Sequence, residues 1–145
     1  MIVICVMDDH GGMLFNHRRQ SQDRILRAWI LQRTKGKKLW MNAYSYEQFA
    51  AESAPHIVVS QQFLHEAAAG DYCFVETCRL KAVESRIEAV IVYRWNRSYP
   101  TDFWLDLALT PPHWVLQTHT AEFAGNSHPC ITEEIYLPAV HGEET

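Results

Sequence analysis

The chain begins with a run of six apolar residues, Ile2 to Met7, most of them β-branched. A short run of this kind is typical of a strand that is buried on both faces of a sheet. Short polar residues and the pair Gly11-Gly12 follow, and these residue types favour a turn. We therefore predict a buried strand over residues 2–7, followed by a mobile polar loop that extends to residue 20.

From Ser21 onward the pattern predicts a helix, because apolar residues recur at amphipathic spacing between Ile25 and Ile30. Asp23 falls in the first turn, where a carboxylate faces the positive end of the helix dipole. A strand, a loop and a helix that starts with an acid suggest the entrance of a ligand-binding site. Two interpretations of Asp23 stay open: an acid that only favours the helix start, and an acid that binds a ligand.

Strands and short helices alternate through the middle of the chain. Strands are expected over residues 38–41, 56–60, 71–75 and 87–95, and helical segments over 46–51, 61–69 and 80–85. Near the C-terminus, two runs of strand character over 114–118 and 131–136 flank a polar loop and predict a long antiparallel hairpin. This order predicts an α/β fold with a mixed sheet, flanked by short helices and ending in an antiparallel hairpin.

Composition narrows the class of protein. With 145 residues, of which 48% are hydrophobic, the chain can bury a core, and we expect one domain over residues 1–137 and an acidic flexible tail over 138–145. No apolar stretch is long enough to span a membrane, and the first run is too short for a secretory signal. The four cysteines form no CxxC pair, which favours reduced thiols and a cytoplasmic location. The sequence does not indicate an oligomeric state.

The net charge of −4 hides an uneven distribution. Residues 16–38 contain eight of the thirteen basic residues and one acid, hence a charge of +7, while the remainder, with five basic residues and sixteen acids, carries −11. A solvated helix face is the simplest interpretation of the basic segment. The alternative is attraction for a phosphate-bearing ligand or for nucleic acid. No aromatic pattern of an RNA-binding module accompanies the segment, so nucleic acid is the lesser option.

Other chemistries have little support in the residues. Asp8-Asp9-His10 could contribute to a metal site with His128, but the spacing matches no known site, and we expect no metal. His128 lies in a polar loop and is expected at the surface. No Gly-x-Ser-x-Gly elbow is present to mark a nucleophile.

The order of these parts resembles dihydrofolate reductase across most of the chain. The clearest likeness is a C-terminal series made of a strand, an acid-plus-aromatic segment, a Trp-led strand, a polar loop and a final strand, at residues 90–95, 99–103, 114–116, 122–128 and 131–136. Lys38 to Met41 and Tyr44 to Glu47 resemble the strand and helix start near the N-terminus of that family. The resemblance implies that Ser60 lies near the adenosine end of a cofactor. It also implies that Asp23 is the acid that binds the pterin and helps to supply a proton.

Several cofactor features of that family are missing at the matching positions. After the strand at 72–75 the chain continues Glu76-Thr77-Cys78-Arg79, without the glycine pair that lets the backbone approach a dinucleotide phosphate. Asn42-Ala43 stands where the family has Gly-Arg, and Phe15 to Arg18 stands near the position of its Met-Pro-Trp run. One strand–helix unit is missing between residues 60 and 72. NADPH is therefore disfavoured, and no cofactor is expected.

We accordingly expect a shortened, diverged dihydrofolate-reductase-like protein that binds a small planar or phosphate-bearing ligand without reductase activity. Two alternatives stay open: an NAD(P)H-dependent reductase of a pterin-like substrate, and an RNA- or protein-interaction module that uses residues 16–38. Asp23 is the candidate catalytic residue, and Ser45 and Ser60 are the candidate cofactor-binding residues. The candidate ligand-binding residues are Asp8, Asp9, Asn16, Arg18, Arg19, Arg27 and Tyr93.

Overall fold

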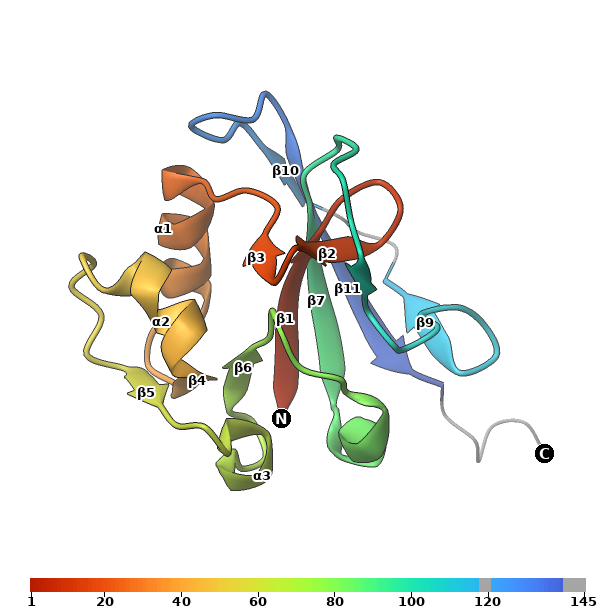
Figure 1. The fold of residues 1–145 in the computed structure, drawn as a ribbon. Helices are drawn as coiled ribbons and strands as arrows, with labels where there is room; N and C mark the ends of the chain where they lie inside the picture. The colour runs from red at the N-terminus through yellow and green to blue at the C-terminus, as the bar shows by residue number, and fades with distance from the viewer. Residues whose placement is uncertain (118–120, 140–145) are drawn as a thin grey trace.

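The structure is a computed structural model that describes residues 1–117 and 121–139. Within these residues the strands form one large mixed sheet and one small antiparallel sheet (Figure 1). The large sheet contains β1 (Ile2–Met7), β4 (Leu39–Met41), β5 (Ile57–Val59), β6 (Tyr72–Phe74), β7 (Ala89–Arg94), β9 (Trp114–Leu116), β10 (Ala121–Phe123) and β11 (Ile131–Pro138). The small sheet contains β2 (Gly12–Phe15), β3 (Arg18–Arg19) and β8 (Phe103–Trp104). The helices are α1 (Arg24–Arg33), α2 (Ala43–Phe49), α3 (Phe63–Glu66) and the 3₁₀ helix η1 (Lys81–Arg86).

The large sheet has the order β10-β11-β7-β1-β6-β4-β5, and β9 also pairs with β11. Strand β1 runs parallel to β6 and β7, and β4 runs parallel to β5 and β6. Strand β11 is antiparallel to β7, β9 and β10. The predicted mixed sheet with an antiparallel C-terminal end is confirmed. The predicted hairpin has an additional strand, because β10 pairs with the first part of β11 and β9 with the last part.

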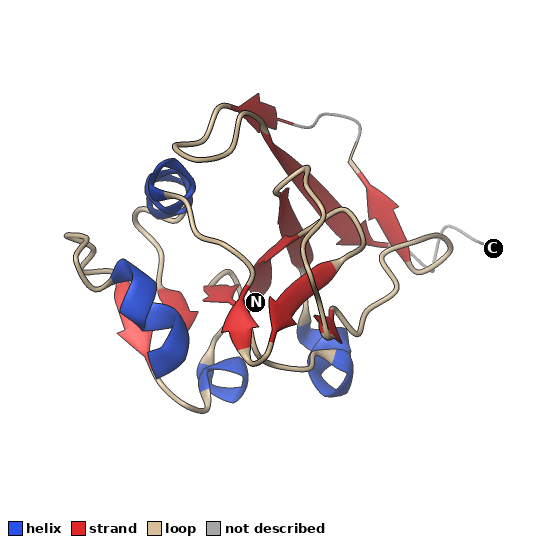
Figure 2. Ribbon diagram, turned by 45° about the horizontal axis from the view of Figure 1, so that its top comes forward, coloured by secondary structure: helices blue, strands red, loops and turns tan. Residues whose placement is uncertain are grey.

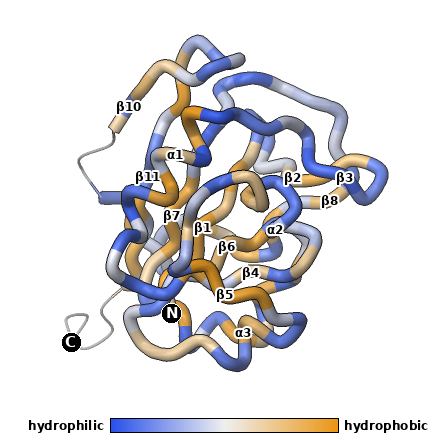
Figure 3. The backbone as a smooth tube through the Cα atoms, turned by 90° about the vertical axis from the view of Figure 1, so that its left-hand side faces the viewer, coloured by the Kyte–Doolittle hydropathy of each residue, from blue (hydrophilic) through white to orange (hydrophobic). Residues whose placement is uncertain are grey.

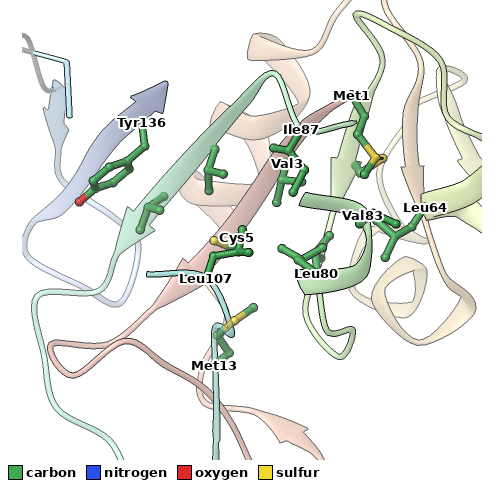
Figure 4. Packing of buried hydrophobic residues seen from close by; sticks show 14 of the residues in the cluster. Met1, Val3, Cys5, Met13, Leu64, Leu80, Val83, Ile87, Leu107 and Tyr136 are labelled. Carbon is green, nitrogen blue, oxygen red and sulfur yellow. Dashed lines mark hydrogen bonds between the residues drawn. The ribbon is translucent and has the colours of Figure 1, made fainter. Parts of the chain in front are cut away.

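Both faces of the large sheet are covered. Successive residues of a strand point to opposite faces, so Val3 and Cys5 of β1 join one hydrophobic cluster and Ile4 joins the other. The first cluster includes residues of η1 and of the segment after β8, as Figure 4 shows around Leu80 and Leu107. The second includes Leu26 and Ile30 of α1 and Phe49 of α2. The helices lie to the left of and below the strands in Figure 2, and the central strands β1, β6 and β7 are mainly hydrophobic (Figure 3). Burial on both faces explains the continuous apolar run at residues 2–7.

Two helices begin at other residues than the sequence predicted. Helix α1 starts after Asp23, which is its N-cap with extended backbone, and Ser21 is not helical. Helix α2 starts at Ala43 because Asn42 caps it, accepting a hydrogen bond from the Ser45 backbone N–H, so Ser45 lies inside the first turn. The predicted helix over 61–69 was too long, since α3 ends at Glu66.

The predicted loop over residues 13–20 was wrong. Strands β2 and β3 form a hairpin there, and β2 also pairs with β8 from much later in the chain. Asn16 and His17 make its two-residue turn with φ angles of 51° and 63°, and positive φ at both positions is the requirement of a type I′ turn. Little in the sequence indicated the hairpin, because β3 has only two residues, both arginines, and the other partner of β2 is the distant strand β8.

The remaining expectations concern the ends of the chain, the thiols and membranes. Pro138, the first residue of the predicted tail, is the last residue of β11, and residues 140–145 lie outside the described residues. The four cysteines are free. Burial raises the pKa of both Cys5 and Cys73 to about 12, which makes these two thiols poor nucleophiles. In the part of the chain that the structure describes, no helix is long and apolar enough to cross a membrane.

Candidate functional site

The candidate site lies where the C-terminal ends of β1 and β6 meet the β2–β3 hairpin and the first turns of α1 and α2. In open α/β sheets this end of the parallel strands is the usual place for ligands. Three buried carboxylates, Asp8, Asp23 and Glu76, gather there. A buried charge is tolerated only when it is paired or hydrogen-bonded, so the partners of each carboxylate define what the site can do.

Asp23 is surrounded by hydrogen-bond donors from two segments. Its Oδ1 accepts from the backbone N–H groups of Ile25 and Leu26 in α1 and of Asn126 in the loop between β10 and β11. Its Oδ2 accepts from the N–H and hydroxyl of Ser127, and lies 3.1 Å from Nδ1 of His128. Asp23 therefore joins the start of α1 to the loop 125–128.

This environment keeps Asp23 ionised. Burial alone would raise its pKa, but the N–H groups of Asn126 and Ser127 and the His128 ring together hold the pKa far below its usual value. The loop is tightly fitted as well, because a Cβ atom added at Gly125 would lie 2.6 Å from Asp23 Oδ2. The residue proposed from sequence as a ligand-binding acid is thus 2% exposed and saturated with protein donors.

Asp8 has a similar role at the end of β1. It accepts hydrogen bonds from the N–H groups of His10, Gly12 and Tyr99 and from the side chain of Gln20. Burial would raise its pKa, but the N–H groups of Tyr99, Gly12 and His10 outweigh that effect and lower it. Asp8 holds the turn into the β2–β3 hairpin and the segment after β7, and it lines neither of the two spaces described below.

Glu76 is held by side chains instead. Arg19 of β3 binds it with two hydrogen bonds, Nε to Oε2 at 2.9 Å and Nη2 to Oε1 at 3.1 Å. The Ser45 hydroxyl of α2 donates to the same carboxylate at 2.8 Å. The Arg19 guanidinium also stacks on Tyr44, 4.4 Å from its ring centroid. This bidentate pair ties the hairpin to β6 and α2.

Two spaces lie beside Arg19, which lines both of them, while Glu76 lines only the first. The first is a cavity of about 20 Å³, lined also by Asp23, Arg27 and Gln48. That volume fits roughly one water molecule, so the cavity has no room for a planar ring in this conformation. Two buried polar atoms lack a partner among the described residues, Oε1 of Gln20 and Nε2 of Gln48. Both residues line this cavity, together with apolar side chains such as Leu26 and Phe49.

The second space is an open hollow of about 410 Å³. It is lined by Phe15, Asn16, Arg18, Arg19, Gln20, Tyr99 and Pro100. Phe15 is 43% exposed, and Arg18 is exposed without an ion-pair partner in the described ranges. The volume falls in the range of roughly 300–1,000 Å³ that is typical of small-molecule sites. Aromatic rings beside a free guanidinium suit a flat ligand that carries a negative charge.

The structure separates the other sequence-predicted residues from this hollow. Arg27 lines the small cavity and pairs with Glu52 at 3.4 Å. Asp9 is exposed and accepts from the Ser98 hydroxyl at 3.3 Å. Tyr93 is fully buried, and its hydroxyl donates to Glu133 at 2.7 Å. Ser60 follows β5 and donates to Glu66 at 2.6 Å.

In the folded protein, several side chains of the basic segment 16–38 form ion pairs. Three of its arginines pair with acids from other parts of the chain: Arg19 with Glu76, Arg27 with Glu52 and Arg33 with Glu133. The positive charge counted along the sequence is therefore partly balanced in space.

Sequence reasoning missed the environment of His128. It was expected at the surface, but it is 2% exposed and stacks on Trp95, with ring centroids 4.2 Å apart. No local signal marks this burial, since it results from the packing of loop 125–128 against α1. Glu76 had a weak signal, because an acid directly after an apolar strand needs a cation, but the sequence did not indicate that Arg19 supplies it. No group of three possible metal-ligating His, Cys, Asp or Glu residues occurs in the described part of the chain.

This topology and site position define an α/β protein with a dihydrofolate-reductase-like fold. Dihydrofolate reductase from Enterococcus faecalis, solved in complex with NADP(H) and RAB-propyl, superposes with a TM-score of 0.64. The two chains share 10% sequence identity, and the match covers 94% of this chain and 95% of that one. At the level of sequence, no protein-family model and no curated protein matches the chain. The likeness is therefore one of fold.

Proposed function

We propose that the chain binds a small planar anion in the hollow lined by Phe15, Arg18 and Tyr99, and that it does not act as a nicotinamide-dependent reductase. The observation that carries the proposal is the arrangement around Arg19. Arg19 is paired with Glu76 beside the small cavity that Asp23 lines, while the larger hollow is open and presents the exposed Arg18.

The residues after β6 do not fit a dinucleotide phosphate. A phosphate site needs N–H groups or cations aimed at the anion, and at this position the chain has the carboxylate of Glu76, 8% exposed and already neutralised by Arg19. A bound phosphate would have to displace this carboxylate from its cation. The saturation of Asp23 by six protein donors also argues against its use in holding a pterin.

Nucleic acid is a weaker candidate partner. The ion pairs of Arg19, Arg27 and Arg33 reduce the positive charge that residues 16–38 offer to a phosphate backbone. Retention of the protein on heparin at physiological salt would reverse this preference.

Thermal-shift and calorimetric titrations test the proposal. Pterin-6-carboxylate, phenyl phosphate and phenylpyruvate are suitable probes, because each joins a flat ring to an anionic group. At least one should stabilise the protein and bind it, and Arg18→Gln should weaken that binding about tenfold, the effect of losing one charged contact worth about 1.4 kcal/mol.

Arg79→Gln is the matched control, because Arg79 is also exposed but does not line the hollow. It should leave binding within about twofold of the unchanged protein. Stabilisation by micromolar NADPH, or failure of all three probes to bind, would contradict the proposal.

A further inference from the structure

A continuous chain of hydrogen bonds runs from Asp23 to Tyr99, which lines the hollow. His128 is its middle member: Nδ1 lies 3.1 Å from Asp23 Oδ2, and Nε2 lies 2.7 Å from the Tyr99 hydroxyl. The three residues come from distant parts of the sequence, namely the N-cap of α1, the loop 125–128 and the segment after β7. The fold alone brings them together.

The protonation of this chain follows from its chemistry. The ionised carboxylate of Asp23 can only accept, so we assign the proton of the 3.1 Å contact between the two side chains to Nδ1 of His128. In this tautomer Nε2 accepts the hydrogen bond of the Tyr99 hydroxyl. The Ser127 hydroxyl lies 3.2 Å from Asp23 Oδ2 and 3.1 Å from His128 Nδ1, and with the proton on Nδ1 it donates to the carboxylate. This is the arrangement by which an acid and a histidine activate a hydroxyl group in nucleophilic and acid–base catalysis.

The surroundings favour proton transfer along this path. His128 is nearly fully buried, and stacking on Trp95 fixes the plane of its imidazole, while the Tyr99 ring meets it at an angle of 63°. Tyr99 is half-buried, and its backbone N–H is held by Asp8. A pre-oriented, largely dry path of this kind needs little rearrangement when a proton moves.

We propose that Tyr99 is an acid–base catalytic residue for the tautomerisation of a small planar oxo acid bound in the hollow. His128 takes and returns the Tyr99 proton, and Asp23 positions His128. The inference rests on the proposed binding function, because it requires a ligand beside Tyr99.

The reaction balances with groups that the chain supplies. The Tyr99 O–H bond breaks as an Nε2–H bond forms, and the phenolate takes a proton from the carbon next to the ligand carbonyl. The C–H electron pair becomes the C=C bond, and the carbonyl π pair moves to oxygen, where Arg18 in the same hollow offsets the charge. His128 returns its proton to Tyr99 and Tyr99 passes one to the enolate oxygen, so that an enol leaves with no atom or electron lost.

The first experiment tests the hydrogen-bond chain without any ligand. Long-range ¹H–¹⁵N NMR of the full chain should show His128 as the neutral Nδ1–H tautomer, with the Nε2 signal shifted by hydrogen bonding. Tyr99→Phe should move the Nε2 signal, and Tyr136→Phe should not, because the Tyr136 hydroxyl bonds to Glu134 instead. A proton on Nε2 would overturn the proposal, because Tyr99 could not then donate to that nitrogen.

The second experiment measures catalysis with phenylpyruvate, whose C3 hydrogens exchange with solvent through its enol. The unchanged protein should accelerate loss of the C3–H signal in D₂O, and Tyr99→Phe should lower that acceleration about a hundredfold, the usual size of general acid–base catalysis. Tyr136→Phe should retain it. His128→Gln should lose the acceleration too, while phenylpyruvate binding changes by less than about threefold.

These measurements separate the two proposals. Binding of phenylpyruvate with equal exchange rates for the unchanged protein and Tyr99→Phe would overturn the catalytic role and leave the binding function intact. The absence of binding by all three planar anions would overturn the binding function and, with it, the catalytic role. The NMR result still decides whether the Asp23–His128–Tyr99 chain is connected as inferred.

Discussion

Asp23 and Glu76 are buried carboxylates at the same end of the sheet, but different groups hold them. Four of the six donors to Asp23 are backbone N–H groups, which belong to the start of α1 and to the loop 125–128. Glu76 depends on the side chains of Arg19 and Ser45. Backbone groups stay in place whatever the sequence, whereas side-chain partners can move or be replaced. Asp23 is therefore part of the framework, and Glu76 is the adjustable partner of Arg19, which lines the hollow.

The largest expected effect is the loss of Asp23. Asp23→Asn puts an amide NH₂ against donors of α1 and loop 125–128, which leaves buried N–H groups unpaired. The free energy of unfolding, measured by urea denaturation, should fall by about 3 kcal/mol. Asp9→Asn is the control, because Asp9 is exposed, and it should change that free energy by less than about 0.5 kcal/mol. Equal free energies of unfolding for the two variants would contradict this structural role of Asp23.

An intermediate effect is expected from pH. The pKa values of Asp8 and Asp23 are both lowered in the folded protein, so their contribution to stability is full well above the unfolded value of about 3.9. It is lost as the pH falls through the folded pKa values, because the unfolded chain then binds more protons.

The measurement is urea denaturation at several pH values. Between pH 6 and pH 3 the free energy of unfolding should drop on the order of 2 kcal/mol from these two groups. The drop should be smaller in Asp23→Asn, which no longer titrates at that position. The same drop in the variant and in the unchanged protein would assign the acid sensitivity to other carboxylates.

The smallest expected effect on stability concerns the Arg19–Glu76 pair. A double-mutant cycle with Arg19→Gln and Glu76→Gln should give a coupling energy of about 1 kcal/mol, since the pair is only partly exposed but is also bridged by Ser45 and Tyr44. Glu76→Gln should also bind a planar anion several-fold more tightly, because Arg19 is released from its partner. Weaker binding of the anion would show instead that the intact Arg19–Glu76 pair helps to form the hollow.

The Asp23 and Glu76 regions also differ in how far the sequence could predict them. The sequence around Asp23 indicated that this acid stands at the start of an amphipathic helix. It did not indicate that Asp23 is the N-cap or that residues 126–128 are its partners. For Glu76, the sequence showed only an acid where a phosphate site would need glycine. Its pairing with Arg19 joins residues 57 positions apart, and local propensity carries no information about such contacts.

The sequence by itself determined most strands of the large sheet, the approximate positions of the helices and the mixed character of the sheet. It did so because hydrophobic periodicity and capping act over a few residues, as in the strand 2–7 and the helix that follows Asp23. Only the tertiary structure decided that residues 12–19 form a hairpin, that His128 is buried between Asp23 and Tyr99, and that Arg19 faces Glu76. Each of these features depends on segments distant in the sequence packing against one another, and their energy is gained only when the whole sheet is assembled.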